Sequence, residues 1–249
     1  MIINAAYYSS KGNHSINEDS ISLVENLNSV IAIVADGLGG EGHGDLASRT
    51  AVKTICRELS CEDASEEQVT AAIVKANEEV VKMHSGNVRM KSTVAVLYIS
   101  NTNSFVANVG DTRVYQFRKN KIIHQTIDHS VSQMSVNVGE IIVDELRGHI
   151  DRNKLTKALG SNSAIEVDIT KLFLHTGDAF LLCSDGFWEH VIEQEMCEDL
   201  STSSNTDEWL GKMRKRVNLR ISPTGDNHSA IAIMLTKKRN INNEHGVLF

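Results

Sequence analysis

The sequence predicts an α+β fold of four layers, α-β-β-α, in which two antiparallel β-sheets are flanked by helices. Strand-like runs rich in Val, Ile and Phe follow one another in groups rather than alternating with helices, which argues against a doubly wound parallel sheet. These runs are nearly continuous in apolar residues, as expected of strands buried on both faces. Segments with helical periodicity stand apart from them, so we expect the helices to pack outside the two sheets.

Each expected strand is bounded by Gly, Asn, Asp or Ser. In chain order the expected strands are Ser29–Ala35, Ser92–Ser100, Ser104–Val109, Thr112–Phe117, Glu166–Leu174, Asp178–Cys183 and Ser229–Thr236.

Three segments predict helices. Apolar residues at helical spacing indicate one helix over Asp45–Leu59 and a second over Ser65–His84. The second opens with Ser65 and Gln68, the spacing of a capping box, which predicts that the helix begins there. A weaker amphipathic pattern predicts a third helix over Thr206–Arg220.

Composition narrows the class of protein. The 249 residues include 25 Lys and Arg against 32 Asp and Glu, a net charge of −7, which weighs against a non-specific nucleic-acid binder. The longest aliphatic runs are about six residues, too short to cross a membrane, and the first twelve residues lack the pattern of a secretory signal. The four cysteines form neither zinc spacing nor a disulfide framework. We therefore expect a cytoplasmic, monomeric protein with a single domain over residues 1–249, ending in a polar tail at 238–249.

Acidic residues recur in one local setting, at the end of an apolar run beside Gly or Asn. One Asp-Gly pair alone is as readily explained as a turn. Several in the same setting place carboxylates at the rim of a core, where ionised groups are costly unless they are paired or bound to a cation. Oxygen ligands favour a hard divalent cation, Mg²⁺ or Mn²⁺. The segments are Asn17–Asp19, Ala35–Gly40, Asn108–Arg113, Cys183–Gly186 and Gly225–Ser229.

In this order the segments resemble the motifs of metal-dependent serine/threonine protein phosphatases of type 2C, the PPM family, in their compact bacterial form. The resemblance extends over about residues 12–235. The matching stretches are NED at 17–19, VADGLGG at 34–40, GDLAS at 44–48, ANVGDTRVY at 107–115, DHS at 128–130, RNKLTKALG at 152–160, LLCSDGFW at 181–188 and DNHS at 226–229.

The resemblance implies a hydrolase that removes phosphate from phosphoserine and phosphothreonine in signalling proteins, opposite a cognate Ser/Thr kinase. It implies two Mn²⁺ or Mg²⁺ ions that activate a water molecule for direct attack on phosphorus, without a phosphoenzyme. Asp36 would bridge both ions, Asp185 and Asp226 would hold the first, and Glu18 and the carbonyl of Gly37 the second. A third ion would lie between Asp111 and Asp185, and Asp19 would act through a water molecule.

Three positions depart from the family pattern. His14 stands where an arginine usually holds the substrate phosphate; His14 is the candidate for that role here, with Arg49, Arg113 or the metals alone as the alternatives. Lys91 stands where glycine is usual, which would imply a shifted loop if that glycine serves a positive φ or a close backbone approach. Leu38 stands where eukaryotic members carry a histidine offered as general acid, so the proton donor to the leaving group is unassigned.

Two alternatives to the phosphatase are open, the first of them suggested by His14 and Lys91. One is a catalytically weak pseudophosphatase that binds phosphoproteins or a signalling partner. The other is a metal-dependent nuclease or phosphodiesterase, although the chain lacks the basic tract that a polyanionic substrate would favour. Because every expected carboxylate is present, the sequence favours the phosphatase.

Overall fold

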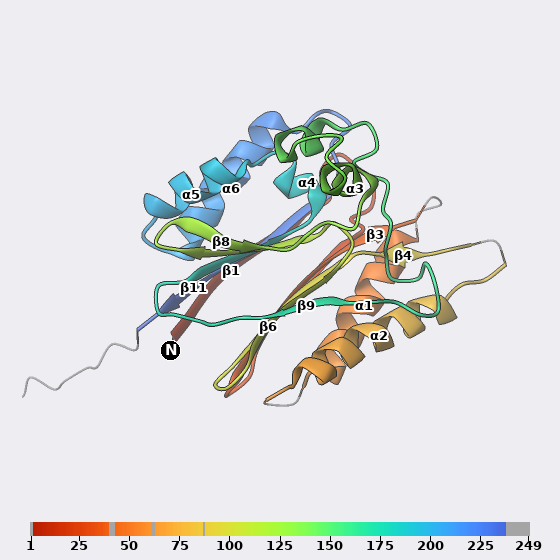
Figure 1. Cartoon of the computed structure of the whole chain (residues 1–249), viewed down its shortest axis with the longest axis horizontal. Helices are drawn as coiled ribbons and strands as arrows, with labels where there is room; N and C mark the ends of the chain where they lie inside the picture. Colours follow the sequence, from red (N-terminus) through yellow and green to blue (C-terminus); the bar gives the residue numbers. More distant parts are fainter. Residues whose placement is uncertain (1, 40–42, 61–62, 87, 238–249) are drawn as a thin grey trace, which may run out of the picture.

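The computed structural model describes residues 2–39, 43–60, 63–86 and 88–237. The predicted polar tail at 238–249, Gly40 of the second motif and Cys61 lie outside the described residues. Two β-sheets lie face to face, with a pair of long helices outside each, so that four layers follow one another from top to bottom in Figure 1. The predicted α-β-β-α sandwich is confirmed.

Within the described residues, one sheet has five strands in the order β1-β11-β10-β7-β8. Their bounds are β1 Ile2–Ser10, β7 Arg113–Arg118, β8 Lys121–Gln125, β10 Ala179–Cys183 and β11 His228–Thr236. The other sheet has the order β2-β3-β5-β6-β9, with the short β4 paired to β3, and every pairing in both sheets is antiparallel. Its strands are β2 Asp19–Glu25, β3 Ser29–Leu38, β4 Lys91–Ser92, β5 Val94–Ser100, β6 Ser104–Val109 and β9 Asp168–Lys171.

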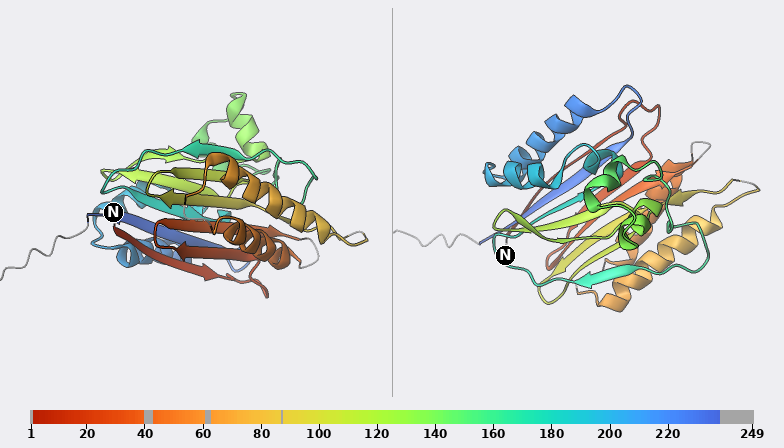
Figure 2. Two further views of the ribbon diagram at one scale, coloured as in Figure 1. Left: turned by 90° about the horizontal axis from the view of Figure 1, so that it is seen from below. Right: turned by 45° about the horizontal axis from the view of Figure 1, so that its top comes forward.

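The helices differ in how much of the sandwich they cover. The helical elements are α1 Gly44–Glu58, α2 Glu66–Lys82, α3 Val131–Asn137, the 3-10 helix η1 Val143–Gly148, α4 Asp185–Trp188, α5 Glu193–Ser201 and α6 Thr206–Arg220. In Figure 2, α1 and α2 lie across the outer face of the six-stranded sheet, and α5 and α6 lie across the other outer face. The short α3 and η1 belong to the long connection between β8 and β9.

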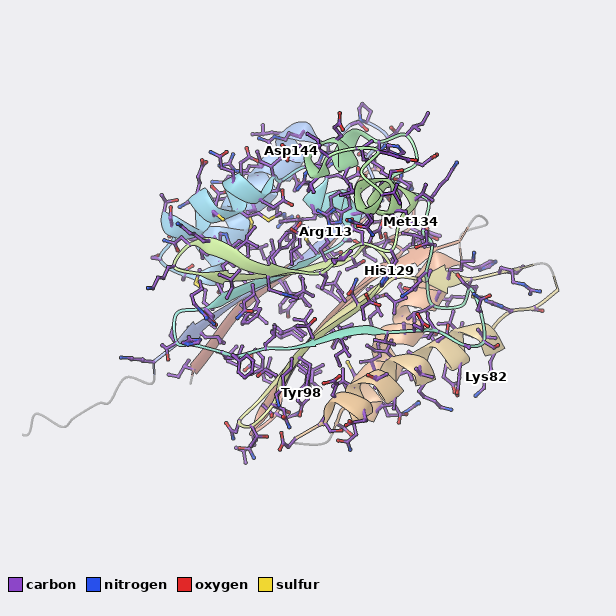
Figure 3. All side chains as sticks on the ribbon, viewed as in Figure 1. Lys82, Tyr98, Arg113, His129, Met134 and Asp144 are labelled. Carbon is purple, nitrogen blue, oxygen red and sulfur yellow. The ribbon has the colours of Figure 1, made fainter. Side chains whose placement is uncertain are left out.

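Alternation along the strands explains why their sequences read as continuous apolar runs. Phe180 and Leu182 of β10 pack between the two sheets, while Leu181 and Cys183 face α5 and α6. In β5, Leu97 faces the other sheet, and Tyr98 belongs to the cluster that packs under α1 and α2. Figure 3 shows Tyr98 beside the N-terminal part of α2. Both faces of the central strands are therefore buried, as the sequence predicted.

The predicted elements agree with the structure in most cases. The side chain of Ser65 accepts from the backbone N–H of Gln68, and Gln68 bonds back to the N–H of Ser65, which confirms the capping box. The strand predicted over Glu166–Leu174 is shorter, at Asp168–Lys171. Strands β1, β2 and β8 and helices α3, α4 and α5 were not predicted from the sequence.

Strand register brings distant segments to one end of the sandwich. Asp19 at the start of β2 pairs with Asp36 near the end of β3. On the facing sheet, Cys183 at the end of β10 pairs with Arg113 at the start of β7. The residues just beyond these strand ends are therefore neighbours in space. In the described ranges, no helix is long and apolar enough to cross a membrane.

Candidate metal centre

A pocket of about 500 Å³ opens at this end of the two sheets. Five carboxylate residues line it, together with the backbone of Gly37. They are Glu18, Asp36, Asp111, Asp185 and Asp226, which come from five separate chain segments. The structure thus brings together all of the acidic residues that the sequence assigned to the metals. Asp19, which was assigned an indirect role, is buried and does not line the pocket.

Close backbone contact places Glu18 and Gly37. The backbone N–H of Gly37 donates to the carbonyl of Glu18 at 3.1 Å, and the N–H of Gly44 donates to Glu18 Oε1 at 3.0 Å. A Cβ atom on Gly37 would overlap the carbonyl oxygen of Gly44, so only glycine permits this approach of β3 to the start of α1. Ser48 of α1 donates its hydroxyl to the carbonyl of Glu18. The Gly-rich motif is therefore a packing device that fixes two candidate ligands.

Hydroxyl groups hold the backbone at Asp36. Thr93 Oγ1 accepts from the N–H of Asp36 at 3.0 Å, and the N–H of Thr93 donates to the carbonyl of Asp36 at 2.8 Å. Ser92 Oγ donates to that same carbonyl. Thr93 Oγ1 also bonds to the hydroxyl of Thr112, in the turn that carries Asp111. Hydroxyl groups thus connect the backbone of Asp36 to that turn.

Asp111 lies in the turn between β6 and β7, and two buried side chains support it. The indole Nε1–H of Trp188 donates to the carbonyl of Asp111 at 2.9 Å. The guanidinium of Arg113 stacks 3.6 Å from the centre of the Trp188 ring and forms two hydrogen bonds with the carboxylate of Asp128. Figure 3 shows Arg113 and His129 near α3, at this end of the sheets. Trp188 is buried in the core, and it also positions a candidate ligand.

One amide side chain, that of Asn227, links the segments that carry Glu18 and Asp226. Asn227 Oδ1 accepts from the N–H of Glu18 at 2.7 Å, and Asn227 Nδ2 donates to the carbonyls of Lys11 and Ile16. Asn227 therefore fastens the loop before β2 to the segment that carries Asp226. Nothing in the sequence pattern alone predicted this contact, because its partners are more than two hundred residues apart.

Burial and mutual repulsion raise the pKa values of the carboxyl groups in and beside the pocket. Burial raises the pKa of Asp36 and of Asp185 well above the ordinary range, and the neighbouring carboxylates raise both further. Burial is also the main cause that raises the pKa of Asp111 and of Asp19 to about 7, and it raises that of Glu18. Ionising these groups together costs free energy, which a divalent cation at the same place would offset.

The donor set fits a hard divalent cation by its chemistry. Carboxylates and a backbone carbonyl are the oxygen ligands that Mg²⁺ and Mn²⁺ take. The buried Asp19 Oδ1 has no hydrogen-bond partner in the part of the chain that the structure describes. Within the described residues, however, no three His, Cys, Asp or Glu side chains are arranged as ligands of one ion. Asp185 Oδ1 and Asp226 Oδ1 instead accept from the adjacent N–H groups of Gly186 and Asn227. Asp185 and Asp226 are thus each oriented by a contact with the next backbone N–H, which leaves Oδ2 of each without that bond.

The cationic residues near the pocket differ from those expected. His14 lines the pocket, and its Nε2 lies 3.6 Å from Asp226 Oδ1. Neither arginine offered as an alternative lines the pocket: Arg113 is buried against Asp128, and Arg49 pairs with Asp45 on the outer side of α1. Arg89 and Lys91 line the pocket instead. Lys91 lies in β4 without a positive φ, so no left-handed backbone conformation calls for glycine at this position.

A sandwich of two antiparallel sheets with a carboxylate-lined pocket at one end defines the class of metal-dependent phosphatases. Residues 8–223 match the family model described as Protein phosphatase 2C, so the chain belongs to that family.

Similar proteins agree with this assignment. The serine/threonine phosphatase stp of Listeria monocytogenes serotype 4b is 34% identical over 202 residues, covering 77% of this chain and 80% of that protein. The PPM Ser-Thr phosphatase MsPP of Mycobacterium smegmatis, solved in complex with cacodylate, has a TM-score of 0.80 and 27% identity, covering 93% of this chain and 97% of that one. The catalytic domain of PstP, solved with 2 manganese ions, shares the fold at a TM-score of 0.79 and 22% identity, covering 94% of this chain and 99% of that one.

Proposed function

We propose that this protein is a metal-dependent phosphatase that hydrolyses phosphoserine and phosphothreonine in other proteins. The observation that carries the proposal is the convergence of five carboxylates from distant segments on one pocket, in a chain of the protein phosphatase 2C family. The 34% identity to a serine/threonine phosphatase of Listeria supports the same substrate class.

The pocket residues divide into groups by position. Asp36, which is central to the repulsion among the carboxylates, would bridge two Mn²⁺ or Mg²⁺ ions. Asp185 and Asp226 would complete the first site, and Glu18 with the carbonyl of Gly37 the second. Asp111 and Asp185, whose charges affect one another, would hold a third ion. The manganese ions in the PstP structure support this cofactor.

When bound, divalent cations at such a site lower the pKa of a water molecule and neutralise charge on a phosphoryl group. The protein's own contribution is to place oxygen donors around the pocket and to hold their backbone through Thr93, Trp188 and Asn227. No Cys, Ser or Thr is among the described residues that line the pocket, which supports direct hydrolysis without a phosphoenzyme. Cys183 is buried, and burial raises the pKa of its thiol, so it is a poor nucleophile.

The biological setting follows from the reaction. A phosphoprotein substrate requires a Ser/Thr kinase that phosphorylates it, and we propose a cognate kinase as the functional partner. We further propose that the chain acts in the cytoplasm as a monomer with a single catalytic domain. The absence of a zinc pattern or disulfide framework in the sequence supports a reducing compartment.

Hydrolysis of p-nitrophenyl phosphate and of a phosphothreonine peptide, measured against Mn²⁺ concentration, tests the proposal. We expect activity that requires the metal and falls at least ~100-fold in Asp36→Asn, whose folding is checked by circular dichroism. Metal-dependent binding of the peptide without turnover would instead support a pseudophosphatase, which the intact carboxylate set does not favour. Cleavage of plasmid DNA would support a nuclease.

A further inference from the structure

We infer that Lys91, with Arg89 beside it, binds the substrate phosphate in place of the arginine that position 14 lacks. This inference rests on the proposed function, since it names the phosphate-recognising residues of the same pocket. Arg49 and Arg113 do not reach the pocket, whereas Arg89 and Lys91 line it.

The charge balance of the pocket favours additional cations. The five lining carboxylates carry five negative charges when ionised, and the two divalent ions of the first and second sites supply four positive ones. A phosphate monoester at neutral pH adds about two more negative charges. When only those two sites are filled, substrate binding without protein cations would bring a dianion into a site that is already negative. Arg89 and Lys91 offset that charge.

The local structure fixes where Lys91 emerges. Ser92 exchanges two backbone hydrogen bonds with Leu159, at 3.1 and 2.8 Å, and the carbonyl of Met90 bonds to the ring of His84 at 2.9 Å. Met90 and Ser92 are buried, so the alternation of a strand turns Lys91 to the open side, where it lines the pocket. A lysine placed between two anchored neighbours has its stem fixed and its ammonium group free to reach a ligand.

The cationic groups are also available for a ligand. Among the described residues, Lys91 and Arg89 form no ion pair, and Arg89 makes only a long contact of 3.4 Å with the carbonyl of Gly86. His14 differs, because its ring nitrogen faces Asp226 at 3.6 Å. When protonated, His14 is directed to a carboxylate rather than to a phosphate. Lys91 is therefore better placed than His14 to contact the anion, and an ammonium group donates to phosphate oxygen as a point charge.

The test compares phosphate binding in Lys91→Met, which keeps the length of the side chain and removes its charge. Titration of the Mg²⁺-loaded protein with inorganic phosphate in a calorimeter needs no turnover. We expect binding about 5- to 20-fold weaker than in wild type, the range for loss of a charge-assisted hydrogen bond in a half-open site. Lys91→Arg should retain most of the affinity. Lys121→Met, in β8 and outside the pocket, is the matched control and should bind as wild type does.

Kinetics give a second measurement. For a phosphothreonine peptide, Lys91→Met should raise KM by a similar factor, with a smaller change in kcat, and Arg89→Met should act in the same direction. His14→Gln should affect phosphate binding less than Lys91→Met does. Wild-type affinity in Lys91→Met, or a larger loss in His14→Gln, would overturn the inference. An absence of metal-dependent hydrolysis in wild type would instead refute the proposed function, and the calorimetric comparison would still decide which residue binds phosphate.

Discussion

Replacing Asp111 by asparagine should stabilise the metal-free protein at neutral pH and change its stability little near pH 4. Burial raises the pKa of the Asp111 carboxyl from 3.8 to about 7, and the charge of Asp128 contributes to the rise. Between these two values the folded protein binds more protons than the unfolded chain, so the free energy of unfolding falls as pH rises. The asparagine side chain of the variant does not titrate, so the variant escapes that loss.

The size of the effect follows from the shift. A rise in the pKa of Asp111 from 3.8 to about 7 corresponds to about 4 kcal/mol for a group that titrates alone. Because Asp111 shares its protons with neighbouring carboxyl groups, we expect about half of that, about 2 kcal/mol at pH 8. For a chain of this length, this gain is a rise in Tm of about 4 to 8 °C.

Thermal unfolding in a metal chelator at pH 4, 6 and 8 measures this difference. Four histidines, two of them buried and two partly buried, titrate in the opposite sense, because burial lowers their pKa values, but they are common to both proteins and cancel in the comparison. A variant that is less stable than wild type at pH 8, or a difference that does not grow between pH 4 and pH 8, would refute the electrostatic account of the pocket.

Three other predictions concern the surroundings of the pocket. Arg113→Met leaves Asp128 buried and unpaired and should lower the free energy of unfolding by about 3 to 5 kcal/mol, measured by urea denaturation; a loss below about 1 kcal/mol would show that the pair contributes little. His14→Arg should lower KM for a phosphopeptide by restoring a bidentate donor at the pocket, and an unchanged or raised KM would count against this. Cys183 should resist iodoacetamide in the native protein and react once the protein is unfolded, because the thiol is buried and burial raises its pKa. Mass spectrometry measures the labelling, and rapid labelling of the native protein would contradict the buried position of Cys183.

Much of the fold could be predicted because its central strands and long helices carry their signal locally. Strands β1 and β2 could not be predicted, because polar residues interrupt their apolar pattern. β1 contains tyrosines and serines, β2 contains serines and acidic residues, and each pairs with only one other strand. β1 forms by pairing with β11, more than two hundred residues away, which no local pattern reports. Helix α5 is short and acidic, so its sequence carries little periodic signal; ion pairs from Arg216 and Arg220 of α6 to its Glu195 stabilise it.

The candidate site, like the fold, could be predicted from the sequence only in part. Four of its five carboxylates follow or precede a recognisable strand beside Gly or Asn and could be predicted from that setting. Glu18 precedes β2, which was not predicted, and was assigned through the family resemblance. The contacts that position the carboxylates could not be predicted: Trp188 reaches Asp111 through its indole nitrogen, and Asn227 reaches Glu18 across the sandwich. The sequence did not predict the positively charged side chains of the pocket either, because the pairing of β4 with β3 is what brings Arg89 and Lys91 to it.

The central claim is that the carboxylates of this pocket together hold divalent cations. Anomalous diffraction from crystals soaked in Mn²⁺ tests it most directly. We predict two strong peaks within coordinating distance of Asp36, one also touching Asp185 and Asp226 and the other Glu18. Peaks confined to other surfaces of the molecule, with the pocket free of manganese at saturating concentration, would contradict the claim.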